Sequence, residues 1–256
     1  MTTQEAGTNF RVAFRQQLEA DRALGLRVVP IAPDSATRLL AVLRGAGLPS
    51  GSGVAGDRVD RLRVLDSEHV RGCTKCGLSR TRTQTVFGQG SPNARLVFVG
   101  EAPGFDEDRQ GLAFVGRAGQ LLTRMITAMG LTREEVFICN VLKCRPPNNR
   151  DPSAEEILAC SPYLREQLSI IEPEVLVALG SPAAKTLLST TESIGRLRGR
   201  FHEYYPSGTI GSGPAIPVMP TYHPAYLLRN PNDKAKTWAD LQMVMDLLGL
   251  PLPKTS

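Results

Sequence analysis

Five cysteines are the residues of this sequence most able to do chemistry: Cys73, Cys76, Cys139, Cys144 and Cys160. The Cys73-x-x-Cys76 spacing brings two thiolates to one metal, and Cys144 followed by Cys160 can complete a four-thiolate site across the fold. Cys139 lies inside a predicted strand, so we expect it to be a small core residue. Spacing alone leaves zinc, an iron–sulfur cluster and unliganded thiols open, whereas disulfides are the weaker explanation in a reducing compartment.

A second set of candidate residues follows four short apolar runs that have the β-branched character of buried parallel strands. The runs are residues 95–100, 136–141, 175–180 and 216–221. The segments that come next are rich in Gly, Pro or polar side chains, and they are residues 100–104, 140–144, 180–182 and 222–229. Because the carboxyl ends of parallel strands share one edge of a sheet, we expect these segments to line a common crevice.

Helical patterns separate the four runs. Residues 118–129 place their apolar side chains on one face, with Gly130 positioned as a C-terminal cap. Ser153 and Glu156 form a capping-box pattern, and Asp233 can cap a last helix that runs to residue 248. The alternation predicts an α/β fold in which helices cover both faces of a doubly wound parallel sheet.

The first 70 residues are predicted to form an N-terminal appendage, partly helical and with a flexible linker, and residues 71–250 the main domain. The linker is expected at 49–53, where Pro, Ser and Gly dominate. Three helices are expected in or next to the appendage, at residues 9–24, 36–44 and 60–71.

Composition and charge narrow the class of protein. The 256 residues, 41% of them hydrophobic, suit one compact domain plus an appendage. No apolar run approaches the roughly 18–20 residues of a membrane span, and the N-terminus lacks a signal peptide's features, so we expect a cytoplasmic protein without membrane contact. The net charge of +5 concentrates between Lys185 and Lys236, where seven basic residues face three acidic ones. This excess is typical of a surface that faces a polyanion, and an ordinary solvated surface explains it equally well.

Five motifs stand in order along the chain: Cys73-Thr-Lys-Cys76-Gly-Leu, Gly100-Glu-Ala-Pro-Gly-Phe-Asp-Glu-Asp108, Phe114-Val-Gly-Arg-Ala-Gly-Gln-Leu-Leu122, Cys139-Asn-Val-Leu-Lys-Cys-Arg-Pro-Pro147 and His223-Pro-Ala-Tyr-Leu-Leu-Arg229. Together they closely resemble the family 4 uracil-DNA glycosylases, over about residues 70–248. The resemblance implies a three-layer α/β/α fold with a central four-stranded parallel sheet and a [4Fe-4S] cluster. It also implies that residues 71–250 flip uracil out of DNA and excise it.

The resemblance also gives roles to individual residues. Phe114 would stack on the flipped base, Asn140 would read its edge, and His223 would donate a hydrogen bond to O2 as negative charge develops there. Glu101 would position water or offset positive charge on the sugar, and Glu107 would crowd the methyl group of thymine. The implied set is Glu101 and His223 as catalytic residues; Ala102, Gly104, Glu107, Phe114, Asn140 and His223 as uracil-binding residues; Ser181, Tyr226, Leu227 and Arg229 as DNA-binding residues; and Cys73, Cys76, Cys144 and Cys160 as cluster ligands.

Departures from the family pattern refine the expected reaction. Ala113 stands where the family usually has a proline before the stacking ring, and Ala102 stands where a related family has an aspartate. Some relatives carry a basic insert after the asparagine strand and become trapped covalently on DNA, but residues 145–150 lead directly to the Cys160 helix. No lysine occupies a matched catalytic position. We therefore expect a monofunctional enzyme that turns over and leaves an abasic site.

Two alternative functions remain open at this point. One is a glycosylase for another deaminated base, hypoxanthine or xanthine, and the other is a non-catalytic iron–sulfur protein that binds DNA damage. Uracil-containing DNA is the expected partner, and we expect a monomer associated with the nucleoid in the cytoplasm. Residues 1–70 either offer a site for a repair or replication protein or are disordered.

Overall fold

The computed structural model describes residues 54–206 and 214–252, which fall within the compact unit Ser52–Ser256. The helices expected at 9–24 and 36–44 and the linker at 49–53 lie outside the described residues. The third expected helix is present and begins earlier, because α3 spans Val54–Val64 and a π-helical segment, η1, continues it over Leu65–Val70.

A six-stranded sheet forms the centre of this unit, in the order β1-β3-β2-β4-β6-β5. Its inner four strands, β3, β2, β4 and β6, are parallel and correspond to the four apolar runs of the sequence. The expected four-stranded parallel sheet is therefore wrong in strand number, because β1 and β5 add an antiparallel strand at each edge. The strands are β1 (Gln89–Gly90), β2 (Leu96–Gly100), β3 (Phe137–Asn140), β4 (Val175–Leu179), β5 (His202–Tyr204) and β6 (Ile216–Thr221).

The two edge strands carry no apolar pattern that could predict them. Strand β1 has only two residues, and Gly90 lies at φ +124°, where a side chain would collide with the carbonyl oxygen of Val136. Strand β5 has three residues, two of which are the polar His202 and Glu203. Short, polar edges of this kind limit pairing with other chains.

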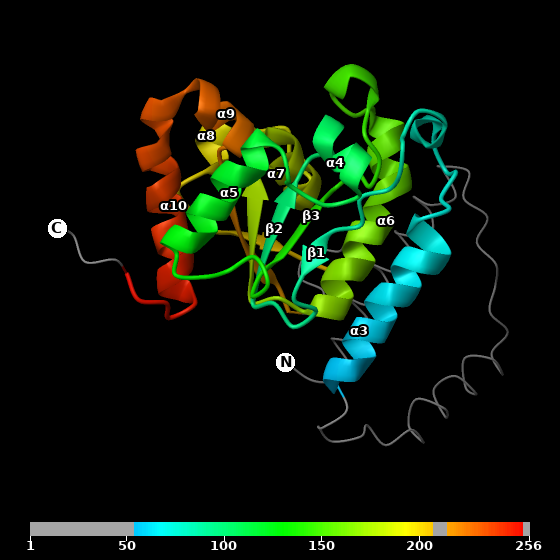
Figure 1. Ribbon diagram of the computed structural model, residues 1–256. Helices are drawn as coiled ribbons and strands as arrows, with labels where there is room; N and C mark the ends of the chain where they lie inside the picture. Colours follow the sequence, from blue (N-terminus) through cyan, green and yellow to red (C-terminus); the bar gives the residue numbers. More distant parts are fainter. Residues whose placement is uncertain (1–53, 207–213, 253–256) are drawn as a thin grey trace, which may run out of the picture. The chain divides into compact units, whose positions relative to one another are not determined.

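Helices cover both faces of the sheet (Figure 1). Alternate residues of β2 point to opposite layers: Val97 and Val99 pack with α3, α6 and α7, whereas Leu96 and Phe98 pack with α5 and α10. The expected α/β/α arrangement is therefore observed. The described helices besides α3 and η1 are η2 (Gly77–Arg80), α4 (Phe105–Gln110), α5 (Arg117–Ala128), η3 (Pro147–Asn149), α6 (Ala154–Ile171), α7 (Ser181–Leu188), α8 (Ile194–Leu197), α9 (Pro224–Arg229), η4 (Pro231–Asp233) and α10 (Lys234–Leu247).

The helix ends expected from the sequence are observed, except that Asp233 does not cap α10 through its side chain. Ser153 and Glu156 form the expected capping box of α6, and Gly130 takes a left-handed conformation just after α5. Asp233 is the N-cap residue of α10, but its side chain makes no capping hydrogen bond. Its carboxylate instead accepts from the Tyr226 hydroxyl at 2.7 Å and pairs with Lys236 at 2.9 Å.

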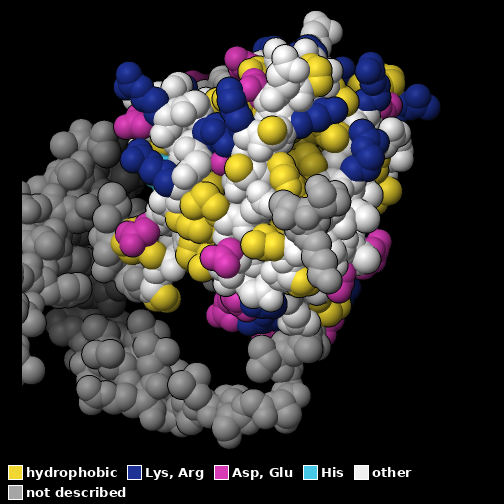
Figure 2. All heavy atoms as spheres, turned by 90° about the vertical axis from the view of Figure 1, so that its left-hand side faces the viewer, with side chains coloured by type: hydrophobic (Ala, Val, Ile, Leu, Met, Phe, Trp, Pro, Cys, Tyr) yellow, Lys and Arg dark blue, Asp and Glu magenta, His cyan; other side chains and the backbone are white. Residues whose placement is uncertain are grey.

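The surface near α10 is basic at one end. Figure 2 shows Lys and Arg side chains gathered in the upper part of this face, above apolar and acidic ones. Two of the seven basic residues between 185 and 236 are neutralised locally, because Arg198 pairs with Asp240 and Lys236 pairs with Asp233. No helix within the described ranges is both long and apolar enough to cross a membrane.

Candidate functional site

The ends of β2 and β3 bring an aromatic ring and an amide side chain together. Gly100 pairs with Asn140 in the parallel register of the two strands. A Cβ atom at Gly100 would lie 2.6 Å from Cζ of Phe114 and would also collide with Oδ1 of Asn140. Glycine at position 100 therefore lets both side chains meet over the strand end.

Asn140 has an unsatisfied polar atom in this place. Its side chain is buried, with 2% of its surface exposed, and Oδ1 has no hydrogen-bond partner among the described residues. A buried acceptor without a donor costs about 1–3 kcal/mol, so such atoms call for an explanation. A ligand that donates a hydrogen bond to Oδ1 would supply one.

The Phe114 ring is held in an uncommon backbone conformation. Phe114 has φ +53°, in the left-handed region, which costs about 1–3 kcal/mol for a residue of this kind and is typical of functional sites. Its ring centroid lies 5.7 Å from that of His223, with the planes tilted by 34°. Phe114, Asn140 and His223, three of the expected base-binding residues, therefore lie around one point.

His223 is oriented by the helix that follows β6. It is the N-cap residue of α9, and its Nδ1 accepts the backbone N–H of Ala225 at 3.0 Å. Burial, with a smaller contribution from the charge of Arg229, lowers the pKa of His223 to about 4. The ring is therefore neutral near pH 7, and its proton lies on Nε2, which is left as a donor.

Glu101 stands one residue beyond β2 and is half-buried. Burial and the nearby negative charge of Asp151 raise its pKa to about 6. The carboxylate is thus mostly ionised at pH 7 and gains a proton as the pH falls through about 6. A half-buried carboxylate with a raised pKa is a frequent feature of catalytic sites.

Glu107 fastens the two loops of the site to each other. Its carboxylate accepts from the backbone N–H of Gly104 at 3.1 Å and from the N–H groups of Val115 and Gly116, both at 2.9 Å. Glu107 thereby links the loop of residues 101–104, which contains Ala102, to the turn that follows Phe114. Its expected contact with a thymine methyl group stays a prediction.

The residues expected to contact DNA are placed in different environments. Ser181 is the first residue of α7 and follows Gly180. Gly180 lies close to His223, because a Cβ atom added at Gly180 would be 3.0 Å from Cβ of His223. Tyr226 stacks on Tyr222 with ring centroids 4.9 Å apart. Arg229 is exposed, whereas Leu227 is 1% exposed and packs inside the core. A DNA contact by Leu227 stays a prediction, and in this structure its side chain does not reach the surface.

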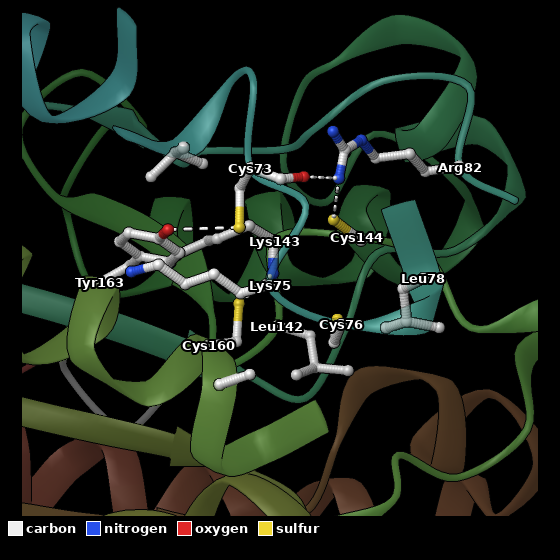
Figure 3. Close-up of a pocket in the computed structure, with 12 residues that line it drawn as sticks. Cys73, Lys75, Cys76, Leu78, Arg82, Leu142, Lys143, Cys144, Cys160 and Tyr163 are labelled. Carbon is white, nitrogen blue, oxygen red and sulfur yellow. Dashed lines mark hydrogen bonds between the residues drawn. The ribbon is translucent and has the colours of Figure 1, made fainter. Parts of the chain in front are cut away.

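The four cysteines expected as ligands line a single cavity (Figure 3). The free volume of this cavity is small, about 10 Å³. Cys73 and Cys76 come from the turn before η2, Cys144 from the segment after β3, and Cys160 from α6. Cys139 lies within β3 and is buried in the core, as expected.

Individual hydrogen bonds from the protein reach sulfurs of this otherwise apolar cavity. The Tyr163 hydroxyl donates to Cys73 Sγ at 3.2 Å, and Arg82 donates to Cys144 Sγ at 3.3 Å (Figure 3). Burial raises the pKa of the Cys160 thiol to about 11, so without a bound cation this thiol stays protonated. Within residues 54–206 and 214–252, no three Cys, His, Asp or Glu side chains converge closely enough to hold a metal ion.

Lys143 is a residue of this region that the sequence analysis missed. It is 1% exposed, and its Nζ donates to the backbone oxygen of Asn140 at 2.7 Å and to Oε1 of Gln167 at 2.5 Å. Its backbone N–H donates to Cys160 Sγ at 3.2 Å. Lys143 therefore connects the cysteine cavity to the residue that carries the unsatisfied amide. The only signal in the sequence is a lysine within an otherwise apolar run, Val141-Leu142-Lys143-Cys144.

Comparison with known proteins identifies the family of this chain. The family model described as the uracil DNA glycosylase superfamily matches residues 87–242. A type-4 uracil-DNA glycosylase of Saccharolobus solfataricus is 46% identical over 195 residues, which are 74% of this chain and 88% of the relative. A type-4 uracil-DNA glycosylase of Thermotoga maritima is 46% identical over 69% of this chain and 88% of the relative. A type-5 uracil-DNA glycosylase of Pyrobaculum aerophilum is 32% identical over 54% of this chain and 64% of the relative. The chain belongs to the uracil DNA glycosylase superfamily and, within it, to the type-4 family.

Proposed function

We propose that the protein is a monofunctional uracil-DNA glycosylase, which hydrolyses the N-glycosidic bond of a flipped deoxyuridine and leaves an abasic site for base excision repair. The observation that carries this proposal is the unpartnered Asn140 Oδ1, buried beside Phe114 and His223. An acceptor, an aromatic face and a neutral donor around one point suit a flipped uracil.

Asn140 and Phe114 recognise the base. Uracil presents an N–H at N3 and a carbonyl oxygen at O4, so Oδ1 of Asn140 accepts from N3 while its amide nitrogen donates to O4. Cytosine has an acceptor at N3 and an amino group at position 4, so both contacts would fail. The Phe114 ring packs against the base face, in the place that its left-handed backbone conformation fixes.

His223 stabilises the departing base. Breaking the glycosidic bond leaves negative charge on uracil, and a fixed donor near O2 lowers the barrier without reorganising. The Nε2–H group of the neutral His223 ring is this donor, because Nδ1 already accepts a hydrogen bond from the backbone N–H of Ala225.

Glu101 acts on the sugar side. Positive charge develops on the sugar as the bond breaks, and an ionised carboxylate both offsets it and orients a water molecule toward it. Lysine chemistry with strand cleavage is not expected, because Nζ of the nearby Lys143 is buried and already bound to Asn140 and Gln167.

We further propose that Cys73, Cys76, Cys144 and Cys160 hold a [4Fe-4S] cluster. The four cysteines line one cavity, and thiolates can hold either zinc or an iron–sulfur cluster. Membership of the type-4 family, which the motifs of this chain identify with the iron–sulfur branch of the superfamily, supports the cluster. The cluster would supply iron–thiolate bonds that tie three segments together, while Lys143 carries that order to Asn140.

Uracil-containing DNA is the partner that the proposed reaction requires. We also propose that the protein is a monomer, that it is located at the nucleoid, and that residues 1–70 bind a repair or replication protein. Light scattering of the purified protein with and without DNA tests the first of these.

The test of the proposed function uses anaerobically purified protein and a labelled oligonucleotide with one uracil. Alkali-dependent nicking at uracil, with none at thymine or cytosine, is the expected result, and nicking without alkali would disprove monofunctional action. If alkali produced strand breaks only in an oligonucleotide with hypoxanthine or xanthine, the substrate would be that base and not uracil. If protein of full iron content bound uracil DNA tightly but released no base, the protein would be a DNA-binding protein and not a glycosylase.

A further inference from the structure

An exposed aromatic ring with two arginine guanidinium groups over it lies at the edge of the site. Phe105 begins α4 and is 52% exposed. The guanidinium carbon of Arg145 lies 5.1 Å from its ring centroid, and that of Arg109 lies 5.6 Å away. None of the proposed catalytic steps uses these three residues.

The topology places this ring on the same edge of the sheet as Asn140. Gly100 and Asn140 are paired at the ends of the parallel strands β2 and β3. Phe105 follows the first of them, and Arg145 follows the second, by the same number of residues. The two segments therefore leave the sheet side by side and meet again where Arg145 contacts the Phe105 ring.

The ring is also fixed relative to the site. Phe105 directly follows Gly104, whose N–H is bound by the Glu107 carboxylate. The same carboxylate holds the N–H groups of Val115 and Gly116, just after Phe114. The distance and orientation between Phe114 and Phe105 are therefore fixed for a ligand that contacts both rings.

The charge around the ring suits a phosphate backbone. Neither Arg109 nor Arg145 forms a salt bridge with a carboxylate of the described residues, although Arg145 donates to Asn149 Oδ1 at 2.8 Å. The neighbouring carboxylate of Asp106 lies next to Gly116. Both guanidinium groups lie over the Phe105 ring, so a base that stacks on the ring takes the place of one of them and leaves its charge beside the neighbouring phosphate. An aromatic ring with free basic groups around it is the combination that binds single-stranded nucleic acid.

We propose that Phe105 is a stacking platform for a base that flanks the flipped uracil, and that Arg109 and Arg145 contact the phosphates next to that base. This inference rests on the proposed function, because it extends the same DNA-binding edge. It assigns a binding site for one nucleotide of a locally unpaired strand.

The first experiment measures DNA affinity and catalysis separately. Phe105→Ala should weaken binding of an undamaged single-stranded oligonucleotide by about tenfold, measured by fluorescence anisotropy, because one base–aromatic stack is lost. The KM for a uracil oligonucleotide should rise by a similar factor, and kcat should change much less. Phe105→Trp should retain the affinity, and Leu247→Ala, which truncates an exposed side chain on α10, serves as the matched control.

A second experiment locates the stacked base. Each nucleotide beside the uracil is replaced in turn by an abasic analogue. In the wild type one position should lose about tenfold in affinity, and in Phe105→Ala that loss should disappear. Unchanged DNA affinity in Phe105→Ala, or equal losses at every position in both proteins, would overturn the proposal. If the wild type fails to excise uracil, the proposed function fails, while the anisotropy measurement still tests the platform.

Discussion

The proposed base-binding site and the cysteine cavity both lie at the end of β3, and they differ in how far their polar atoms are hydrogen-bonded within the protein. At the base-binding site, Asn140 Oδ1 lacks a partner and Nε2 of His223 is left as a donor. In the cavity, Cys73, Cys144 and Cys160 each already receive a hydrogen bond from the protein. The first arrangement leaves polar atoms for a ligand to satisfy, whereas the second satisfies them within the protein.

Lys143 lies where the two regions meet. Its ammonium group binds the backbone of Asn140, and its own backbone binds Cys160. Burying a charged lysine costs free energy unless hydrogen bonds satisfy the charge. Burial disfavours the charged form of Lys143 and therefore lowers its pKa. The comparison therefore predicts that changes on the base side reduce catalysis alone, whereas changes on the cavity side reduce stability and catalysis together.

The largest effect on catalysis should come from Asn140→Ala. Loss of both edge contacts should lower kcat/KM for uracil excision by about 10³-fold, in the range found when a fixed polar contact is removed from an active site. Iron content should stay at the wild-type level. Asn93→Ala, at an exposed position in the loop before β2, is the control. A loss of less than tenfold in Asn140→Ala would show that another group reads the base.

Glu101→Gln should lower kcat by about 10²-fold and should also change the pH profile. In the wild type the rate should fall as the pH drops through about 6, because protonation removes the carboxylate charge. The variant should lack this limb. His223, with a pKa of about 4, should not contribute to the profile above pH 5. Because burial disfavours the ionised carboxylate, the variant should also unfold at a higher temperature at pH 7, measured by circular dichroism. A retained acidic limb would assign it to another group.

Cys144→Ser should act on the other side of the comparison. Iron per protein should fall below about half, with loss of visible absorbance and a lower unfolding temperature, because a structural metal group contributes directly to folding. Cys139→Ala is the matched control, since Cys139 is buried in β3 and should not be a ligand. A Cys144→Ser protein with full stability and little iron would show that the cavity does not need its occupant to hold the fold.

The main part of the fold could be predicted from sequence because it rests on local patterns. Four buried strands are continuous apolar runs, and the capping box of α6 is a short-range signal. Strands β1 and β5 could not be predicted, since a pair of residues or three mixed residues at a sheet edge carry no periodicity. Their formation depends on pairing with β3 and β6, which is a long-range event.

The site was predictable only in part, for a related reason. Phe114, Asn140 and His223 were found through the motifs that contain them, and the structure then brought them together. The roles of Glu107 and Lys143 depend on backbone groups that are distant in sequence or hidden in the fold. A lysine is normally exposed, so residue type alone gave no reason to place Lys143 in the core.

Lys143→Met should have the smallest effect on catalysis and the most informative one. The apolar side chain fills the space but leaves the Asn140 backbone oxygen and Gln167 Oε1 without their donor, which should cost about 1–3 kcal/mol of unfolding free energy. If Lys143 positions Asn140, kcat/KM should also fall by about tenfold, with discrimination between uracil and cytosine weakened. Lys185→Met, at an exposed position on α7, should change none of these. Lower stability with unchanged discrimination would mean that the base site and the cavity are neighbours in space but act independently. Reduced discrimination with wild-type iron content would instead assign the coupling to the lysine itself, because the occupant of the cavity would be unchanged.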